Sequence, residues 1–472
     1  MRGKVVAGIL VPALVVGGAG AYAVADAYDV VPGFITNEPV PVEPAPFRTA
    51  AAVTPAPVPS FPVGVLSADA PVPSASVVQL AAEQVRSDGR TGDSTNVSVV
   101  DALTGDVYAD VDAADVQVPA STTKLLTAVG ALAALGPDYR MTTSLVWEPN
   151  SGVLTIVAGG DMLLAAGAGH AGAGEDANGY VGIGDLVAAA LESADFAPGA
   201  PVTVVVDDSR FEADPINPEW PQYALDQGYI APASGLAVDI ARMTDEHYAP
   251  RYPDPSLAAG DVLVAALEDA GVDVDGEAER ASAPTNGIEV AAVESAPLAD
   301  VLFLLLRDSD NTIAEIVSLV NALESGRATT PAGASEATRA GLSSIGAPVS
   351  GLVLLDGAGF SENNRIAPAH LTGALVAALA SPVTADVLDL LPVGGLEGTV
   401  ATRFEGTDAA GALRAKTGSL TGVTALAGTV QTADGRLLAF AVLADGMPYG
   451  QAGPRAAMDA LVQTLAGCGC ED

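Results

Sequence analysis

Residues 119–128 read PASTTKLLTA, and their apolar continuation predicts the first turn of a buried helix. Ser121 and Lys124 stand three positions apart in this turn, so both side chains project from the same helix face. Serine is a weak nucleophile until a neighbouring base takes its proton. A lysine amine can be that base only where burial or a second cation lowers its pKa. The stretch therefore predicts a nucleophile beside its base, although Ser-x-x-Lys also occurs at ordinary helix starts.

Lysine is rare in this chain. Of 20 lysines and arginines only three are lysines, namely Lys4, Lys124 and Lys416. An arginine guanidinium cannot lose its proton in a protein, whereas a lysine amine can. Because Lys4 belongs to an N-terminal targeting segment, the other two lysines are the ones placed for chemistry.

Two further motifs follow the first. Residues 309–311 read SDN after an apolar run, and residues 416–419 read KTGS before a strand-like run. The order S-x-x-K, S-D-N, K-T-G is the set used by serine acyl-transferases that react with penicillins. Taken singly, the second motif could be a helix cap and the third a turn. All three in this order indicate one acyl-transfer site.

Each polar side chain has a predicted role in this site. Ser121 would attack a carbonyl to give an acyl-enzyme, and Lys124 would take its proton. Ser309 would relay that proton to the leaving amine, and Asn311 would hold the substrate amide and the Lys124 side chain. Lys416 would lie across the cleft, near a substrate carboxylate, and depress the pKa of Lys124. Backbone N–H groups at Ser121 and on the Lys416 strand would form an oxyanion hole, where one donor is worth about 2.7–4 kcal/mol.

The composition limits the possible partners. The chain has 58 acidic against 20 basic side chains and a net charge of −38, which repels nucleic-acid phosphates and excludes nucleic-acid binding. His170, His247 and His370 have no metal-ligand spacing, so neither a metal nor a cofactor is expected. Cys468 and Cys470 lie in the last five residues, which suggests a dispensable tail, with a local or interchain disulfide as the alternative.

The N-terminus predicts export from the cytoplasm. Residues 1–36 are interpreted as a signal-anchor or signal peptide, because two basic residues precede an uncharged run over 5–25 that is long enough to span a bilayer. The length of this run favours an uncleaved anchor. Either reading places the remainder in the extracytoplasmic cell envelope, membrane-anchored or secreted, with membrane contact through this segment only. Residues 37–76 are Pro-rich and predict a semi-stiff linker.

The globular part divides into a split unit and an insertion. The first two motifs are separated by 188 positions, counted from Ser121 to Ser309, which is far more than one helix needs. We therefore expect a catalytic domain at 77–141 and 285–466, an inserted domain at 142–284, and a tail at 467–472.

At this level of detail the chain resembles the class C low-molecular-mass penicillin-binding proteins, the D-alanyl-D-alanine carboxypeptidase/endopeptidase family. Besides the three motifs and the large insertion, several segments resemble family sequences: DGAGFS at 356–361 with NRIAP at 364–368, LPVGG at 391–395 with GT at 398–399, KTGSL at 416–420 with GV at 422–423, GD at 160–161 and DDSRF at 207–211. The resemblance covers about residues 77–466.

The resemblance implies an α/β (α+β) fold of the serine DD-peptidase/β-lactamase kind, with an antiparallel sheet packed with helices, a helical subdomain and an inserted mainly β/α domain. It implies cleavage of the terminal D-Ala-D-Ala bond of peptidoglycan stem peptides, or of the D-Ala–diaminopimelate cross-link, and inhibition by penicillins. The resemblance assigns the roles described above to the same five residues, Ser121, Lys124, Ser309, Asn311 and Lys416. It also assigns Thr417, Gly418 and Ser419 to substrate binding, with the Ser419 N–H in the oxyanion hole.

The sequence also departs from the family pattern. The insertion looks short, and Glu362 stands where many relatives have arginine, which puts the recognition of the stem side chain in doubt. Trp220, Asp226 and Tyr229 are possible members of that side-chain pocket, although packing explains the aromatic residues equally well.

Two other functions compete with the peptidase interpretation. The first is a β-lactamase or esterase on the same scaffold, which is disfavoured because no convincing Glu-x-x-x-Asn loop stands between the second and third motifs. The second is a non-catalytic envelope protein that binds peptidoglycan. A binder has no need of the pairing between Ser121 and Lys124, so the intact motifs favour an enzyme.

Overall fold

The computed structural model describes residues 69–92, 94–171, 176–212, 214–447 and 452–468, together with 19, 22 and 23. The chain divides into the units Met1–Val63 and Gly64–Asp472, and the folded elements belong to the second. Apart from residues 19, 22 and 23, the expected N-terminal segment lies outside the described residues, as do most of the linker and Cys470. Within the described ranges, no helix has both the length and the apolar character needed to cross a bilayer.

A five-stranded antiparallel sheet carries the catalytic motif KTGS. Its order is β10-β11-β12-β1-β2. The strands are β1 (Ser94–Asp101), β2 (Val107–Val111), β10 (Leu413–Leu420), β11 (Val423–Gln431) and β12 (Leu437–Asp445). β1 pairs with β12, so the beginning and the end of the folded chain meet in the middle of the sheet. β10 is an outer strand, and residues 392–394 bond to the first part of its outer edge, at Leu413–Ala415. The KTGS stretch lies beyond these bonds, so a ligand can approach its edge.

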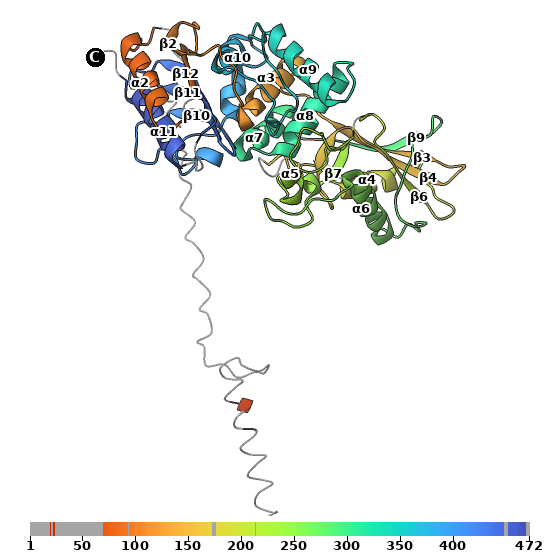
Figure 1. Cartoon of the computed structure of the whole chain (residues 1–472). Coiled ribbons are helices and arrows are strands. Elements are labelled where there is room, and N and C mark those ends of the chain that lie inside the picture. Colours follow the sequence, from red (N-terminus) through yellow and green to blue (C-terminus); the bar gives the residue numbers. More distant parts are fainter. Residues whose placement is uncertain are drawn as a thin grey trace, which may run out of the picture. The chain divides into compact units, whose positions relative to one another are not determined.

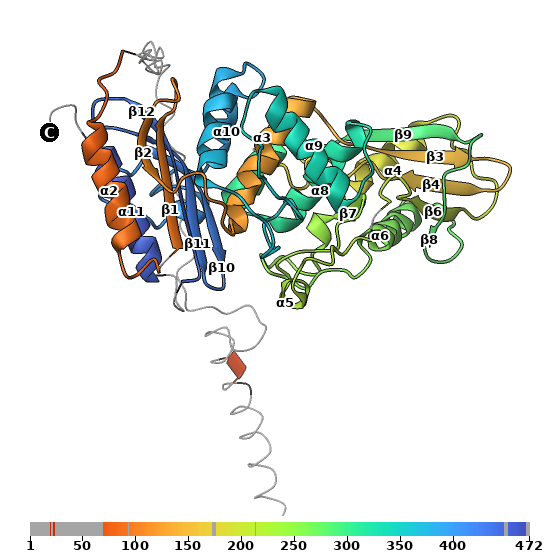
Figure 2. The ribbon, with the colours of Figure 1, turned by 45° about the horizontal axis from the view of Figure 1, so that its top comes forward.

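Helices cover both faces of this sheet (Figure 2). Alternate residues of a strand point to opposite faces, and β12 shows the division clearly. Phe440 and its alternate neighbours pack on α2 (Ala75–Ser87) and α11 (Ala452–Gly467). The small residues Ala439 and Ala441 face the other side, where α10 (Pro368–Ala380) packs on the sheet.

A helical subdomain lies beside the sheet (Figure 1). It contains α3 (Thr123–Leu135), α7 (Leu298–Asp308), α8 (Asn311–Glu324) and α9 (Pro331–Ser344). The helices α3 and α9 cross at a point where both carry glycine. A Cβ on Gly341 would lie 2.2 Å from the carbonyl oxygen of Gly130, so this close crossing depends on the missing side chain.

The insertion forms a second sheet of order β8-β6-β4-β3-β9. Its strands are β3 (Thr142–Glu148), β4 (Val153–Val157), β6 (Thr203–Asp207), β8 (Glu279–Arg280) and β9 (Ile288–Glu294), and the helices α4 (Ile183–Glu192) and α6 (Pro255–Asp269) share its core. The sheet continues past residue 284, where the sequence analysis ended the insertion, because β9 pairs with β3. The division of the chain into these two domains otherwise stays a prediction.

Short elements complete both parts of the fold. In the insertion they are β5 (Asp161–Leu164), α5 (Gln222–Asp226), β7 (Leu236–Val238) and the 3₁₀ helix η2 (Asp239–Ala241). In the catalytic unit they are the 3₁₀ helices η1 (Ala120–Thr122), η3 (Ala385–Leu390) and η4 (Gly398–Val400). Leu163 and Ile230 lie in the same apolar core as the helices of the catalytic unit. Val353 forms an isolated bridge with Arg365, and the loop that carries Asp356 follows it.

Candidate active site

The turn that carries Ser121 is pressed against strand β10. Ser121 lies in η1, directly before α3. Ala120 has a φ of 48°, a left-handed conformation that is costly for a residue with a side chain. On the facing strand, a Cβ at Gly418 would lie 2.8 Å from the carbonyl oxygen of Pro119. The glycine of the KTG motif thus lets the nucleophile turn approach the sheet edge.

Lys124 is buried and its amine has three partners. Nζ lies 3.0 Å from Ser121 Oγ, 2.7 Å from Asn311 Oδ1 and 2.6 Å from the carbonyl oxygen of Ala358. No part of Lys124 is exposed to solvent. Burial lowers the pKa of Lys124 to about 8, against the opposing effect of nearby carboxylates. An amine at this position can lose its proton near neutral pH and then accept one from Ser121.

Asn311 connects the amine to the insertion. Its Oδ1 accepts from Lys124, and its Nδ2 donates to the carbonyl oxygen of Tyr229 at 2.8 Å. Asp310 caps the N-terminus of α8, where its Oδ1 accepts from the N–H of Ile313 at 2.9 Å. The SDN motif is therefore both a helix cap and a site element, and the two readings of the sequence coexist.

Ser309 occupies the left-handed end of α7. Its φ of 58° is one that non-glycine residues rarely adopt, and such residues concentrate at functional sites. It lines the same cleft as Ser121. The structure thus brings Ser121, Lys124, Ser309 and Asn311 together, as the sequence analysis expected.

Lys416 is closer to the protein interior than the sequence analysis expected. The side chain is fully buried, and Nζ donates to the carbonyl oxygen of Thr417 at 2.8 Å. Burial, with the nearby charge of Lys124, holds the pKa of Lys416 well below its usual value. The amine belongs to the wall of the site and not to the lining of the cleft. The charge effect recorded here is that of Lys124 on Lys416, whereas the lowered pKa of Lys124 comes from burial. Direct contact of Lys416 with a substrate carboxylate does not follow from this geometry.

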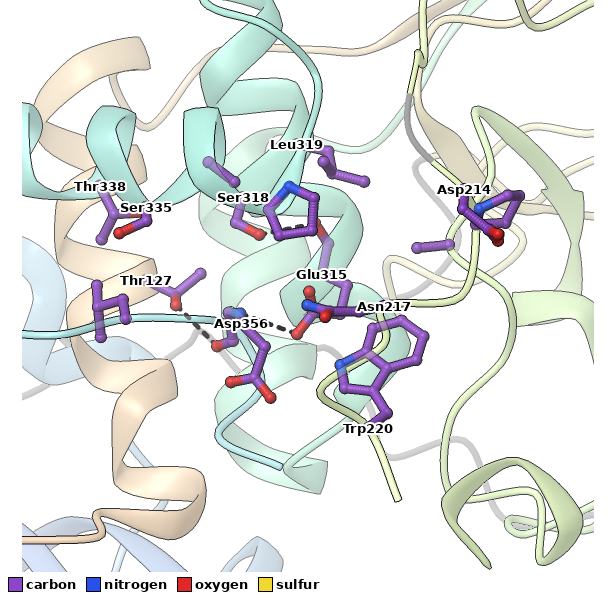
Figure 3. A pocket seen from close by; sticks show the side chains of 16 residues that line it. Thr127, Asp214, Asn217, Trp220, Glu315, Ser318, Leu319, Ser335, Thr338 and Asp356 are labelled. Atoms are coloured by element: carbon purple, nitrogen blue, oxygen red, sulfur yellow. Dashed lines mark hydrogen bonds between the residues drawn. The ribbon is translucent and has the colours of Figure 1, made fainter. Parts of the chain in front are cut away.

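The loop 356–359 positions the carbonyl oxygen of Ala358, which is the third partner of Lys124. Glu315 Oε1 accepts the N–H groups of Gly357 at 2.9 Å and Ala358 at 2.7 Å. Asp356 accepts the N–H of Gly359 at 2.8 Å. Figure 3 shows Glu315 and Asp356 next to Thr127, whose hydroxyl donates to the carbonyl oxygen of Gly357 at 2.8 Å. The loop is thereby fixed from both sides.

The two carboxyl groups behind this loop, those of Glu315 and Asp356, belong to buried residues, each 5% exposed. Burial raises the pKa of Glu315 well above its usual value, and burial also raises the pKa of Asp356. The sequence analysis did not identify Glu315 as part of the site. The available signal was an acidic residue one helical turn after Asn311 within an otherwise apolar stretch.

A cleft of about 430 Å³ opens beside Ser121. Its lining brings together the SDN motif, the edge strand β10, and three side chains of the insertion, Tyr223, Tyr229 and Tyr248. The ring of Tyr229 meets Tyr248 edge-to-face at 4.9 Å and Tyr223 at 6.4 Å between centroids. Arg403 and Arg455 also line it. The cleft therefore has an aromatic wall and carries positive charge near β10.

Comparison with known proteins places this site in a family. Residues 78–251 and 241–468 match the D-Ala-D-Ala carboxypeptidase 3 (S13) family. A carboxypeptidase DacB from Mycolicibacterium smegmatis is 36% identical over 385 residues, which is 79% of this chain and 80% of that protein. A D-alanyl-D-alanine carboxypeptidase from Actinomadura sp. strain R39 is 30% identical across 89% of this chain and 90% of that protein.

The chain belongs to the D-Ala-D-Ala carboxypeptidase 3 (S13) family. Among solved structures, penicillin-binding protein 4 (dacB) from Haemophilus influenzae has the same fold, with a TM-score of 0.66, 20% identity, and coverage of 82% of this chain and 98% of that one. The family and the fold class expected from the sequence are both confirmed.

The residues suggested for the stem side-chain pocket of this S13 chain are separated by the structure. Tyr229 lines the cleft. Trp220 is 7% exposed and lines a small separate cavity beside Glu315 (Figure 3). Asp226 ends α5 and accepts from Gln222, outside the cleft lining. The sequence analysis did not assign Tyr223 and Tyr248 to the site, because residues 211–256 have little regular periodicity.

Glu362 affects the electrostatics of the aromatic wall formed by Tyr223, Tyr229 and Tyr248. Burial raises the pKa of Tyr223, and the nearby charge of Glu362 adds to this effect. Glu362 itself is exposed. Glu362 therefore lies close to the aromatic wall. In the ranges described, no group of three or more His, Cys, Asp or Glu side chains has a geometry that could hold a metal ion.

Proposed function

We propose that Ser121 is the nucleophile of this peptidase and Lys124 its general base. As a member of the S13 family, the chain is a serine-type D-alanyl-D-alanine carboxypeptidase, a hydrolase. The observation that supports the residue roles is the 3.0 Å contact between Ser121 Oγ and an amine that is fully buried. A neutral Lys124 takes the hydroxyl proton as Oγ attacks the carbonyl carbon of the penultimate D-alanine.

The edge of β10 gives the substrate its orientation in this proposal. An extended peptide can lie along the free edge of an outer strand and bond to its backbone. The carbonyl oxygen then points at the N–H groups of Ser121 and Ser419, which would stabilise the tetrahedral oxyanion. Removing one such donor typically costs about 2.7–4 kcal/mol in the transition state.

Proton transfer completes each half of the reaction. The proton taken by Lys124 passes through the hydroxyl of Ser309 to the nitrogen of the leaving D-alanine, and the C–N bond breaks to leave an ester on Ser121. A water molecule then attacks this ester, with Lys124 again taking a proton and Ser121 regaining its own. Asn311 holds Lys124 through its Oδ1 in both halves. The net reaction is hydrolysis of one peptide bond.

We extend the same mechanism to two further reactants. The first is the D-Ala–diaminopimelate cross-link of peptidoglycan, which presents the same D-alanyl carbonyl. The second is the β-lactam ring, which acylates the same serine and leaves an ester that deacylates slowly. One relative from Dictyostelium discoideum carries the name penicillin-sensitive carboxypeptidase A, and the Haemophilus influenzae fold relative has been solved with a β-lactam.

We also propose that the enzyme works in the extracytoplasmic envelope, attached to the membrane by its N-terminal segment or secreted. The support is the basic start followed by the uncharged run over 5–25 and the Pro-rich linker behind it. A fusion of residues 1–76 to a reporter that is active only outside the cytoplasm would be active if this is correct. A reporter without activity would contradict the proposed location.

One experiment tests the nucleophile and the β-lactam reaction together. The full-length chain and its Ser121→Ala variant are mixed with benzylpenicillin, and intact mass is followed over time. We expect a lasting one-to-one adduct on the wild type and none on the variant. Rapid loss of the drug without an adduct would identify a β-lactamase instead. Neither adduct nor drug loss, together with no release of D-alanine from a D-Ala-D-Ala peptide, would favour the non-catalytic alternative.

A further inference from the structure

The positive charge of the cleft comes from arginine. Both lysines of the motifs are fully buried and contribute no surface to the lining. Arg403 lines the cleft, but its guanidinium is already bound to Asp459, through Nε at 3.0 Å and through Nη2. An arginine engaged by a carboxylate of its own chain is a poor ligand for a second one. The remaining cation of the described lining is Arg455.

Arg455 is exposed and forms no ion pair with the residues that the structure describes. It lies near the start of α11, and its Nη2 donates to Ser419 Oγ at 3.1 Å. In the described part of the chain, no acidic side chain forms an ion pair with it, although the whole chain has 58 acidic residues against 20 basic ones. An arginine in this setting keeps most of its five donors available for a ligand.

The position of Arg455 does not help its own helix. A cation in the first turns of a helix is repelled by the positive end of the helix dipole, so helix stability gives no reason for arginine here. The side chain instead extends to the KTGS strand. Ser419 and Thr417 stand two positions apart on β10 and therefore point to the same face, and Thr417 Oγ1 lies 2.9 Å from Thr399 Oγ1. Hydroxyl donors and a guanidinium thus gather at one end of the cleft.

We infer that Arg455 binds the free α-carboxylate of the residue that leaves, with the hydroxyls of Thr417 and Ser419 as its neighbours. This inference rests on the proposed function and assigns the specificity for a charged chain end to a residue outside the three motifs. A planar guanidinium can bond both oxygens of a carboxylate, which fixes orientation as well as charge. The scissile bond would then be placed one residue away from the anchored carboxylate, over Ser121.

The inference also separates two kinds of substrate. A terminal D-alanine and a diaminopimelate leaving group both present a free carboxylate next to the scissile amide, so Arg455 serves both. A substrate whose carboxylate is converted to a carboxamide offers no negative charge to the guanidinium. The enzyme should therefore discriminate against amidated chain ends, and this discrimination should depend on Arg455.

The test compares an N-acylated tripeptide ending in D-Ala-D-Ala with its C-terminal carboxamide. The quantity measured is kcat/KM for the release of D-alanine or D-alaninamide, by chromatography with mass detection. The wild type should prefer the acid. Arg455→Gln should lower kcat/KM for the acid about 10- to 100-fold, the size expected for a charged hydrogen-bonded pair, and leave the carboxamide within about twofold. Arg455→Lys should restore part of the preference.

The matched control is Arg339→Gln on α9, which removes the same charge from an exposed site outside the cleft. It should leave both rates unchanged, and all variants should unfold at the wild-type temperature. An Arg455→Gln enzyme whose kcat/KM falls equally for both substrates, or that keeps the wild-type preference for the acid, would overturn the inference. The peptidase function would still stand. A wild type inactive on both peptides would overturn the proposed function, and this inference with it.

Discussion

Glu315 and Ala358 are bound to each other across the back of the active site: the carboxylate of Glu315 accepts the N–H of Ala358 at 2.7 Å. The carbonyl oxygen of the same Ala358 accepts the amine of Lys124 at 2.6 Å. One buried carboxyl group therefore fixes the backbone N–H of a residue whose carbonyl oxygen orients the general base. Because all of these atoms are shielded from water, a small displacement of the loop would move the amine relative to Ser121.

Replacing Glu315 with alanine should therefore damage both stability and catalysis. The change leaves two buried N–H groups, those of Gly357 and Ala358, without an acceptor. Each costs about 1–3 kcal/mol, for a total of about 2–6 kcal/mol in the free energy of unfolding. Urea unfolding measures this loss. The rate of acylation by benzylpenicillin should fall as well, by about 10- to 100-fold, since misplacing a reacting group by 1 Å costs about that much.

Two control variants distinguish the loss of this hydrogen-bond acceptor from the mere loss of a carboxylate. Glu315→Gln keeps an acceptor oxygen and should retain more stability than the alanine variant. Glu336→Ala removes an exposed carboxylate from α9 and should leave both measurements unchanged. If Glu315→Ala were as stable and as fast as the wild type, the loop would not depend on this side chain.

The sequence predicted the site because its key residues lie in three short motifs. Ser121 and Lys124 are neighbours on one helical turn, so their contact follows from spacing alone. The contact with Asn311 was predicted from the order of the three motifs, because no local pattern brings the SDN motif to that helix. The residues that sequence reasoning missed lie outside the three motifs, namely Glu315 one turn further along α8 and Arg455 on α11.

The extent of the insertion shows a similar limit. Strand periodicity at 288–294 is visible in the sequence, but only the pairing of β9 with β3 assigns it to the second sheet. Trp220 was a reasonable member of the substrate pocket by residue type, yet it is buried in a separate cavity. Partner strands and the direction of a side chain in an irregular segment depend on tertiary contacts that a single sequence does not display.

The pH dependence of acylation should follow Lys124. Its pKa is lowered to about 8 by burial, and only the neutral amine can accept the proton of Ser121. The second-order acylation rate with benzylpenicillin should therefore rise about tenfold per pH unit below pH 8 and level off above it. Rates measured from pH 6 to 9 by stopped-flow or quenched intact mass give the profile. A rate that falls or stays constant over this interval would contradict a lysine base.

The variant Lys124→Met tests the assignment of that titration. Methionine has a similar length without the amine, so the buried site stays filled. The loss should be about 10²- to 10⁴-fold, the usual contribution of a general base, and the remaining rate should lack the rise toward pH 8. A variant that kept the same profile at a lower rate would place the titrating group elsewhere.

Gly359 packs directly against the turn before Ser121, and this close contact requires that residue 359 has no side chain. Its φ is 88°, and a Cβ there would lie 2.1 Å from the carbonyl oxygen of Ala120. Gly346 is a matched control, because its φ is 85° but an added Cβ would meet nothing within 4 Å. Gly346→Ala should cost about 1–2 kcal/mol of unfolding free energy from backbone strain alone and leave acylation unchanged.

Gly359→Ala should cost the same strain and, in addition, about 1–3 kcal/mol for the forced displacement of the turn before Ser121. Acylation by benzylpenicillin should slow about 10- to 100-fold, because the displaced backbone carries the nucleophile. The difference between the two alanine variants isolates the steric contact from the conformational strain. Equal unfolding free energies and equal acylation rates for Gly346→Ala and Gly359→Ala would show that the turn at Ala120 tolerates the displacement, and the glycine would then serve only its own backbone conformation.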